Sequence, residues 1–186
     1  MSFLATFFVA SPDELRQHFP HRHAVAKELH WEETVNPFTQ QVTKVQTWQP
    51  MEKVPAPPAG TEFPTEGELA ALEQLPHCEL KGISPVELAA FADALGLADY
   101  PTAFQELLRL QFVTPTAEDM MIPLPDALVT ALATMSPDKV AEVCQLNENF
   151  DEWTPEEVRD AWAELQPLAK AATAIGGTLI YWVYGL

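Results

Sequence analysis

Basic residues and cysteines are both scarce in this chain of 186 residues. It has 10 lysines and arginines against 27 aspartates and glutamates, and its two cysteines are Cys78 and Cys144. Two isolated cysteines without a Cys-x-x-Cys spacing indicate neither a disulfide framework nor a zinc site. We therefore expect both to be buried free thiols, in a reducing compartment.

The chain also lacks an apolar run long enough to cross a bilayer. Its first ten residues, MSFLATFFVA, are apolar but carry none of the basic residues with which a secretory signal begins. Ser11-Pro12-Asp13-Glu14 follows at once and is typical of a helix start. We expect a buried strand followed by a helix, in a cytoplasmic protein.

Familiar catalytic and nucleotide-binding motifs are absent from the sequence. It contains no Gly-x-Ser-x-Gly, no Gly-x-Gly-x-x-Gly, no phosphate-binding P-loop, no His-Glu-x-x-His and no calcium-binding EF-hand loop. The sequence therefore gives no ground for assigning a catalytic residue or a cofactor, and we predict that the protein is not an enzyme.

Four of the five histidines lie within thirteen positions and form the best metal candidate. His18, His21 and His23 could share a metal ion with a nearby carboxylate. Against this, Pro20 interrupts the helix between the first two, and Arg22 would place a positive charge beside the ion. We predict no metal site, and a metal-dependent enzyme using this cluster stays an alternative.

The hydrophobic pattern predicts an α+β fold. Expected strands are Phe3–Ala10, the hairpin arms Trp31–Val35 and Val42–Trp48 around the turn Asn36-Pro37-Phe38-Thr39, and a terminal strand at 178–184. We predict one small mixed or antiparallel sheet made of the N-terminal strand, the hairpin and the C-terminal strand. The two terminal strands should be neighbours in it, and about six or seven helices should pack with it.

Proline at the first helical position, often behind serine or threonine, marks most of the expected helices. The predicted starts are Ser11, Thr65, Ser84, Pro101, Pro125, Ser136 and Thr154. On the last and longest helix, to about Ile175, apolar residues recur at helical spacing and predict one buried face. They are Val158, Trp162, Leu165, Ala169 and Ala172.

We expect residues 1–186 to form a single domain. It divides into a β-rich part at 1–48, a proline-rich crossing at 49–64, a helical part at 65–177 and a terminal strand at 178–184. Five prolines make the crossing unfit for a helix or a central strand, so extended chain is expected.

Negative charge is concentrated in the helical part. The formal net charge is −17, of which residues 1–60 contribute −1, residues 61–135 contribute −10 and residues 136–186 contribute −6. Such a chain repels nucleic acid and anionic membranes and attracts basic partners. The alternative explanation is that the charge serves solubility alone.

The last predicted helix carries Glu156, Asp160 and Glu164 one turn apart. Like charges at this spacing destabilise a helix by about 0.2–0.5 kcal/mol per pair, so a helix built for stability alone would place lysine among them. Trp153 is either an aromatic anchor for a partner or an apolar staple that packs on Val158. The predicted partner-binding residues are Asp151, Glu152, Trp153, Glu156, Glu157, Asp160 and Glu164, with Glu118 and Asp119 as a second cluster.

These features favour an acidic inhibitor that binds a basic protein. In size, acidity and lack of catalytic motifs the chain resembles bacterial immunity proteins that neutralise nuclease toxins. The expected partner is a basic toxin domain, whose active or substrate-binding surface the carboxylates would occlude. No nucleic acid and no membrane is expected as a partner.

Overall fold

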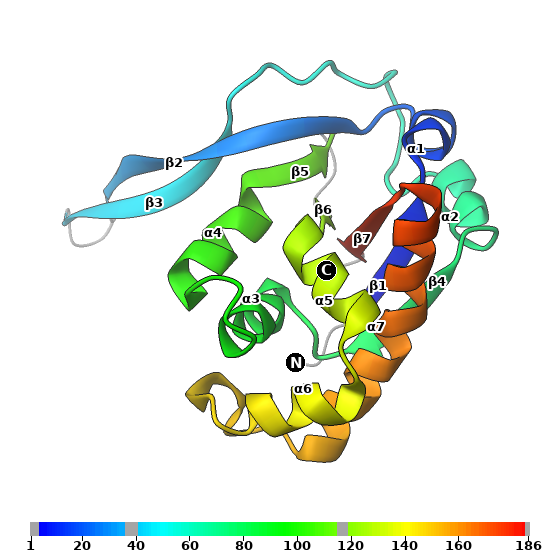
Figure 1. Ribbon diagram of the computed structural model, residues 1–186. Helices are drawn as coiled ribbons and strands as arrows, with labels where there is room; N and C mark the ends of the chain where they lie inside the picture. Colours follow the sequence, from blue (N-terminus) through cyan, green and yellow to red (C-terminus); the bar gives the residue numbers. More distant parts are fainter. Residues whose placement is uncertain (1–3, 36–40, 115–118, 185–186) are drawn as a thin grey trace.

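The computed structural model describes residues 4–35, 41–114 and 119–184, apart from the side chains of Val45 and Gln46. Within these residues the chain forms seven α-helices, one short 3-10 helix and seven strands, arranged in two antiparallel sheets (Figure 1). The elements are β1 (Leu4–Ala10), α1 (Pro12–His18), β2 (His23–Val35), β3 (Val42–Pro50), α2 (Glu66–Leu72), β4 (His77–Lys81), α3 (Pro85–Ala94), α4 (Tyr100–Arg109), β5 (Leu110–Val113), β6 (Met120–Pro123), α5 (Asp126–Thr134), α6 (Pro137–Cys144), η1 (Glu148–Phe150), α7 (Pro155–Ile175) and β7 (Thr178–Val183).

The four-stranded sheet has the order β4-β1-β7-β6 and forms the centre of the protein. The prediction that the two terminal strands are neighbours is confirmed, since Phe7 pairs with Tyr181 and Val9 with Leu179. This antiparallel pairing joins the two ends of the chain through backbone hydrogen bonds.

Both faces of this sheet are covered, which is why β1 and β7 are almost uniformly apolar. On one face Phe7, Val9 and Tyr181 belong to the large core that helices α3 to α7 complete. On the other face Phe8 and Trp182 belong to a smaller core. That smaller core is completed by residues of α2 and of the chain segments beside α1 and α2.

The helix starts follow the predicted capping chemistry. Ser11, Thr65, Ser84 and Thr154 each accept a hydrogen bond from a backbone N–H in the first turn, within a capping box closed by a glutamate. The longest helix, α7, has 21 residues, and the face predicted to be apolar is buried. No helix in the described part of the chain combines the length and apolarity that crossing a membrane requires.

The prediction of a single small sheet is wrong. The hairpin β2–β3 does not join the terminal strands but forms a separate three-stranded sheet with β5, in the order β3-β2-β5. Three further strands, β4, β5 and β6, lie within residues 65–177, for which the sequence pattern predicts helices. These strands have only four or five residues each, too few for a periodic pattern to reveal them.

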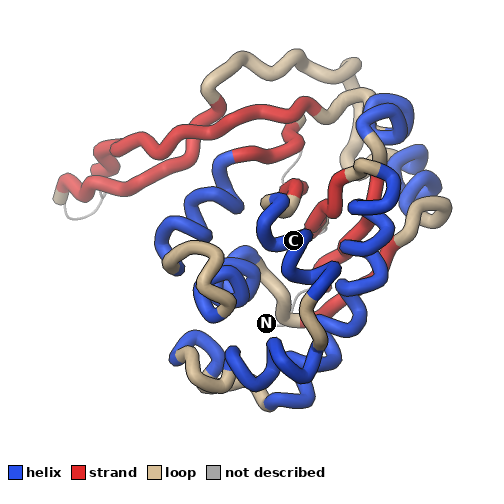
Figure 2. The backbone as a smooth tube through the Cα atoms, in the orientation of Figure 1, coloured by secondary structure: helices blue, strands red, loops and turns tan. Residues whose placement is uncertain are grey.

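Strand β2 is longer than predicted because its first residues pair with β5, from His23–Val113 to Ala26–Leu110. Its second half pairs only with β3 and extends beyond the body of the protein (Figure 1). The predicted turn Asn36-Pro37-Phe38-Thr39 lies outside the described residues. The proline-rich segment 51–64 then runs along the molecule as an extended loop to α2 (Figure 2).

Candidate functional site

A groove of about 510 Å³ lies between α7 and the end of β4. Its wall on the α7 side carries most of the residues predicted to bind a partner, and its other wall is the turn from β4 to α3. The lining residues are Glu152, Trp153, Glu157, Asp160, Ala161, Glu164, Leu80, Lys81, Gly82 and Ile83. We call this the acidic groove.

Helix α7 presents its carboxylates to the groove because its opposite side is held in the core. Val158, Trp162 and Leu165 are completely buried. Residues three and four positions apart share a helix face. Because these three side chains are held in the core, Glu157, Asp160 and Glu164 face outward together. The indole N–H of Trp162 also donates to the Met135 carbonyl at 3.2 Å, which fixes the rotation of the helix.

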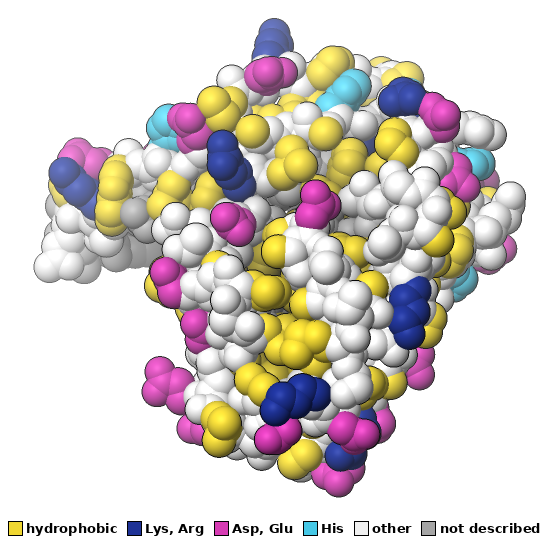
Figure 3. Space-filling view, viewed as in Figure 1, with side chains coloured by type: hydrophobic (Ala, Val, Ile, Leu, Met, Phe, Trp, Pro, Cys, Tyr) yellow, Lys and Arg dark blue, Asp and Glu magenta, His cyan; other side chains and the backbone are white. Residues whose placement is uncertain are grey.

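The groove combines four carboxylates with one ammonium group, that of Lys81. Hydrogen bonds from the backbone N–H and the side chain of Thr154 lower the pKa of Glu157, so this carboxylate stays charged well into the acidic range. On the face of the molecule shown in Figure 3, Asp and Glu side chains are spread over the helical half. The groove is therefore suited to a cationic ligand.

Strand β4 is an edge of the central sheet, and in the described residues no strand pairs with its outer side. Val9 N–H donates to the carbonyl of Pro76, just before β4. Backbone groups alternate in direction along an antiparallel strand, so those of His77, Glu79 and Lys81 point away from β1. Within the described residues, a row of backbone donors and acceptors without a strand partner thus runs along β4 towards the acidic groove.

Two of the predicted residues on and before α7, Asp151 and Glu156, do not line the groove. Glu156 approaches Arg159, with 3.8 Å between its carboxylate and the guanidinium, and Arg159 also pairs with Asp138 at 2.7 Å. Asp151 is exposed at the end of the 3-10 helix. Trp153 is half-buried, and its ring contacts those of Phe91 and Phe150. It therefore lines the groove and also packs against the core.

The second predicted cluster is described only at Asp119, which lies largely inside the protein. Glu118 lies outside the described residues. Asp119 is 6% exposed and accepts hydrogen bonds from Arg22 at 2.6 Å and from the indole of Trp182 at 2.7 Å. Two adjacent acids in a loop predict a solvated pair, but the tertiary structure places Asp119 largely inside the protein.

Arg22 is the centre of this buried ion cluster. Its guanidinium is completely buried, bonds Glu68 at 2.7 Å as well as Asp119, and lies over the rings of Phe63 and Trp182. Burial by itself would lower the pKa of Arg22, but the hydrogen bonds to Asp119 and Glu68 outweigh it and raise the pKa. The cluster ties the turn after α1 to α2 and to the central sheet.

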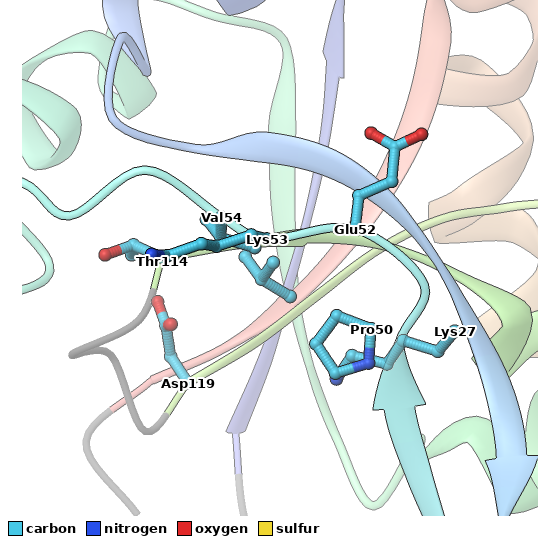
Figure 4. Close-up of a pocket in the computed structure, with 8 residues that line it drawn as sticks. Lys27, Pro50, Glu52, Lys53, Val54, Thr114 and Asp119 are labelled. Atoms are coloured by element: carbon cyan, nitrogen blue, oxygen red, sulfur yellow. The ribbon is translucent and has the colours of Figure 1, made fainter.

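A second cavity of about 370 Å³ lies under the proline-rich segment. Figure 4 shows Thr114 and Asp119 on one side of it and Pro50 and Lys27 on the other, with the Glu52 carboxylate turned away. Lys27 donates to Gln111 at 2.6 Å, and Asp119 is held by Arg22. Its charged groups are of both signs and partly engaged within the protein, so the acidic groove is the better candidate site.

The histidine cluster does not converge on one point. The ring of His21 contacts Phe63 edge-on, and His23 begins β2 opposite Val113. Across the described ranges, His, Cys, Asp and Glu side chains nowhere gather in a group of three or more that could hold a metal ion.

The β4 wall of the groove is not among the predicted residues and is made by Leu80, Lys81, Gly82 and Ile83. A signal was present, since residues 77–81 alternate between polar and apolar side chains. Cys78 and Leu80 are half-buried, whereas His77, Glu79 and Lys81 are exposed. Five residues of period-two pattern between two helices are a weak sign of a strand.

Cys78 offers a chemical probe of this arrangement. Burial, with Glu164 and Glu79 as further causes, raises its pKa to about 12. At pH 8 we expect iodoacetamide to alkylate it roughly a thousandfold more slowly than a free thiol, because only the thiolate reacts. Mass spectrometry after timed quenching measures this rate.

The substitution Glu164→Gln is expected to speed alkylation of Cys78 and leave Cys144 unchanged. Burial alone raises the pKa of Cys144 to about 12, so this thiol is an internal control for loosening of the whole fold. Equal acceleration at both cysteines would show that the Glu164 carboxylate does not act on Cys78.

Comparison with protein-family models, curated proteins and solved structures finds no match to this chain.

Proposed function

We propose that this protein is an acidic inhibitor that captures a basic segment of another protein in the groove between α7 and β4. A bacterial immunity protein that neutralises a basic toxin domain is the class that fits best. The observation that carries the proposal is the convergence of four carboxylates and Trp153 on one groove beside β4, whose outer edge no described strand covers. Inhibition would follow because the captured residues are the ones the partner uses to hold its anionic substrate.

The geometry suggests how an extended segment would bind. It would add to β4 through backbone hydrogen bonds, and every second side chain would then face α7. Such side chains are about 6.6 Å apart, while Glu157, Asp160 and Glu164 rise by about 4.5 and 6 Å along the helix axis. Lysine or arginine at alternate positions could therefore meet successive carboxylates, with Trp153 as an apolar contact at one end.

Charge reversal in the groove tests the site. We expect Asp160→Lys combined with Glu164→Lys to weaken binding of a basic partner about a hundredfold at low salt, since two close opposite charges become repulsive. The probe is a fluorescent peptide of alternating lysine and threonine, with affinity measured by anisotropy. Pull-down from the native cell extract, with and without the substitutions, then identifies the natural partner.

The matched control is Glu73→Lys combined with Glu106→Lys, two exposed carboxylates outside the groove. It changes the net charge of −17 by the same amount and should leave affinity within about threefold. An equal loss in the control would show that only total charge matters, as expected if acidity serves solubility. A peptide with the same lysines in one block should bind more weakly, and equal binding would exclude pairing with β4.

A further inference from the structure

The cavity under the proline-rich segment has charged groups of opposite sign on its two sides. Lys27 of β2 lies on one side and Asp119, just before β6, lies on the other (Figure 4). Lys53 of the proline-rich segment also lines it, whereas the carboxylate of Glu52 is turned away. The cavity has a volume of about 370 Å³, within the range of known sites for small molecules.

The ammonium group of Lys27 is half-buried without a counter-charge. It donates to the neutral side-chain oxygen of Gln111 at 2.6 Å, and no carboxylate of a described residue pairs with it. Burial lowers the pKa of Lys27, and no neighbouring charge opposes this effect. A charge that is taken out of water without a partner costs free energy, and an anionic group in the cavity would offset that cost.

Asp119 offers the complementary group on the other side. Its hydrogen bonds from Arg22 and from the indole of Trp182 both end on Oδ2, and Oδ1 accepts none from a described residue. Arg22 is shared with Glu68, so one guanidinium faces two carboxylates and one negative charge remains unbalanced. A cationic donor in the cavity could therefore bind Oδ1 of Asp119.

The opposite charges favour a ligand that carries both signs. A simple anion would meet the charge of Asp119, and a simple cation would meet the ammonium groups of Lys27 and Lys53. A round cavity of this volume is about 9 Å across, and a small zwitterion with hydrogen bonds of about 2.8 Å at both ends spans a similar distance.

The rest of the lining suits an aliphatic side chain. Pro50, Val54 and Val113 contribute apolar surface from β3, the proline-rich segment and β5. Ligand sites typically combine such apolar walls with a few polar groups that fix the orientation of the ligand. An α-amino acid of moderate size has both parts, a charged end and an apolar side chain.

We propose that this cavity binds a free α-amino acid with an aliphatic side chain, whose carboxylate binds Lys27 and whose ammonium group binds Asp119. The site is separate from the acidic groove, so each can fail without the other. A bound amino acid would connect β2 and β5 with the proline-rich segment and with the central sheet. Because it binds only the folded chain, it should stabilise the fold.

Thermal unfolding of the full chain with L-leucine tests the proposal. We expect L-leucine at about 10 mM to raise the unfolding midpoint by roughly 3–6 °C, as a ligand at about ten times its Kd would do. Two half-ligands are the controls: isocaproate lacks the ammonium group and isoamylamine lacks the carboxylate. Each should shift the midpoint by less than about 1 °C, because one charged side of the cavity then stays unpaired.

Substitutions at the lysines test the geometry by calorimetric titration with L-leucine. Lys27→Met keeps the apolar stem and should weaken binding at least tenfold, while Lys27→Arg keeps the charge and should bind more tightly than Lys27→Met. Lys53→Met removes an exposed charge from the same cavity and should weaken binding about threefold.

The matched control is Lys170→Met, which changes the net charge equally at an exposed lysine of α7 outside the cavity. It should leave the affinity within about twofold, since distant exposed charges are screened. Circular dichroism of each variant checks that the fold is kept. The proposal is overturned if leucine, isoleucine and valine all leave the midpoint unchanged, or if isocaproate acts as strongly as leucine. Equal losses of affinity in Lys27→Met and Lys170→Met would overturn it as well.

Discussion

Replacing Arg22 with methionine is expected to lower the free energy of unfolding by about 3–5 kcal/mol, since it leaves two buried carboxylates without their cation. Glu68 and Asp119 are 2% and 6% exposed and both bond the guanidinium. Small domains have a total stability of about 5–15 kcal/mol, so this loss would be a large part of the total. Urea unfolding followed by circular dichroism measures it.

Arg16→Met is the matched control, because the ion pair of Arg16 with Asp13 is exposed. It should change stability by about 0–1 kcal/mol. The triple variant Arg22→Met, Glu68→Gln, Asp119→Asn should recover part of the loss, because its side chains carry no buried charge. If the free energy of unfolding of the Arg22→Met variant lies within about 1 kcal/mol of the wild-type value, the cluster does not stabilise the fold.

Replacing Trp162 with alanine is expected to lower the free energy of unfolding by about 3–5 kcal/mol. Its side chain is completely buried, contacts the ring of Phe91 and donates its indole N–H to Met135. The Met135 carbonyl keeps a second donor, Gln166 at 2.7 Å, so the loss comes from the cavity and the lost packing rather than from an unpaired carbonyl. The urea concentration at the unfolding midpoint should fall, while the slope of the free energy of unfolding against urea concentration stays unchanged.

Trp153→Ala separates the stability of α7 from the function of its groove. Trp153 is only half-buried, so its replacement should cost about 1–2 kcal/mol, well below the loss at Trp162. It should nevertheless weaken binding of the alternating basic peptide, because its ring lines the groove. A larger stability loss at Trp153 than at Trp162 would mean that the buried face of α7 is not its main anchor.

Salt is expected to weaken capture of a basic segment in the groove. The attraction between the groove carboxylates and a basic segment is screened as the ionic strength rises.

Residues close together in the sequence were predicted well, because local chemistry determines them. The caps at Ser11, Thr65, Ser84, Ser136 and Thr154 form as expected, since a hydroxyl can reach a backbone N–H only two or three residues away. The buried face of α7 followed from helical spacing, and with it the side on which Asp160 and Glu164 lie. One distant contact was also predicted, because two almost uniformly apolar strands have to be covered on both faces, which favours β1 and β7 as neighbours in the centre.

What the sequence by itself determined is therefore the caps, the faces of the long helix, the acidity of the helical part and the pairing of the two chain ends. Only the tertiary structure decided which sheet the hairpin joins, where β4 completes the groove, and that Asp119 pairs with Arg22. These three depend on residues between 40 and 100 positions apart, and no local propensity encodes such a contact. An aspartate in a loop has the same local chemistry whether it meets water or a buried guanidinium, and only the packing around it decides between them.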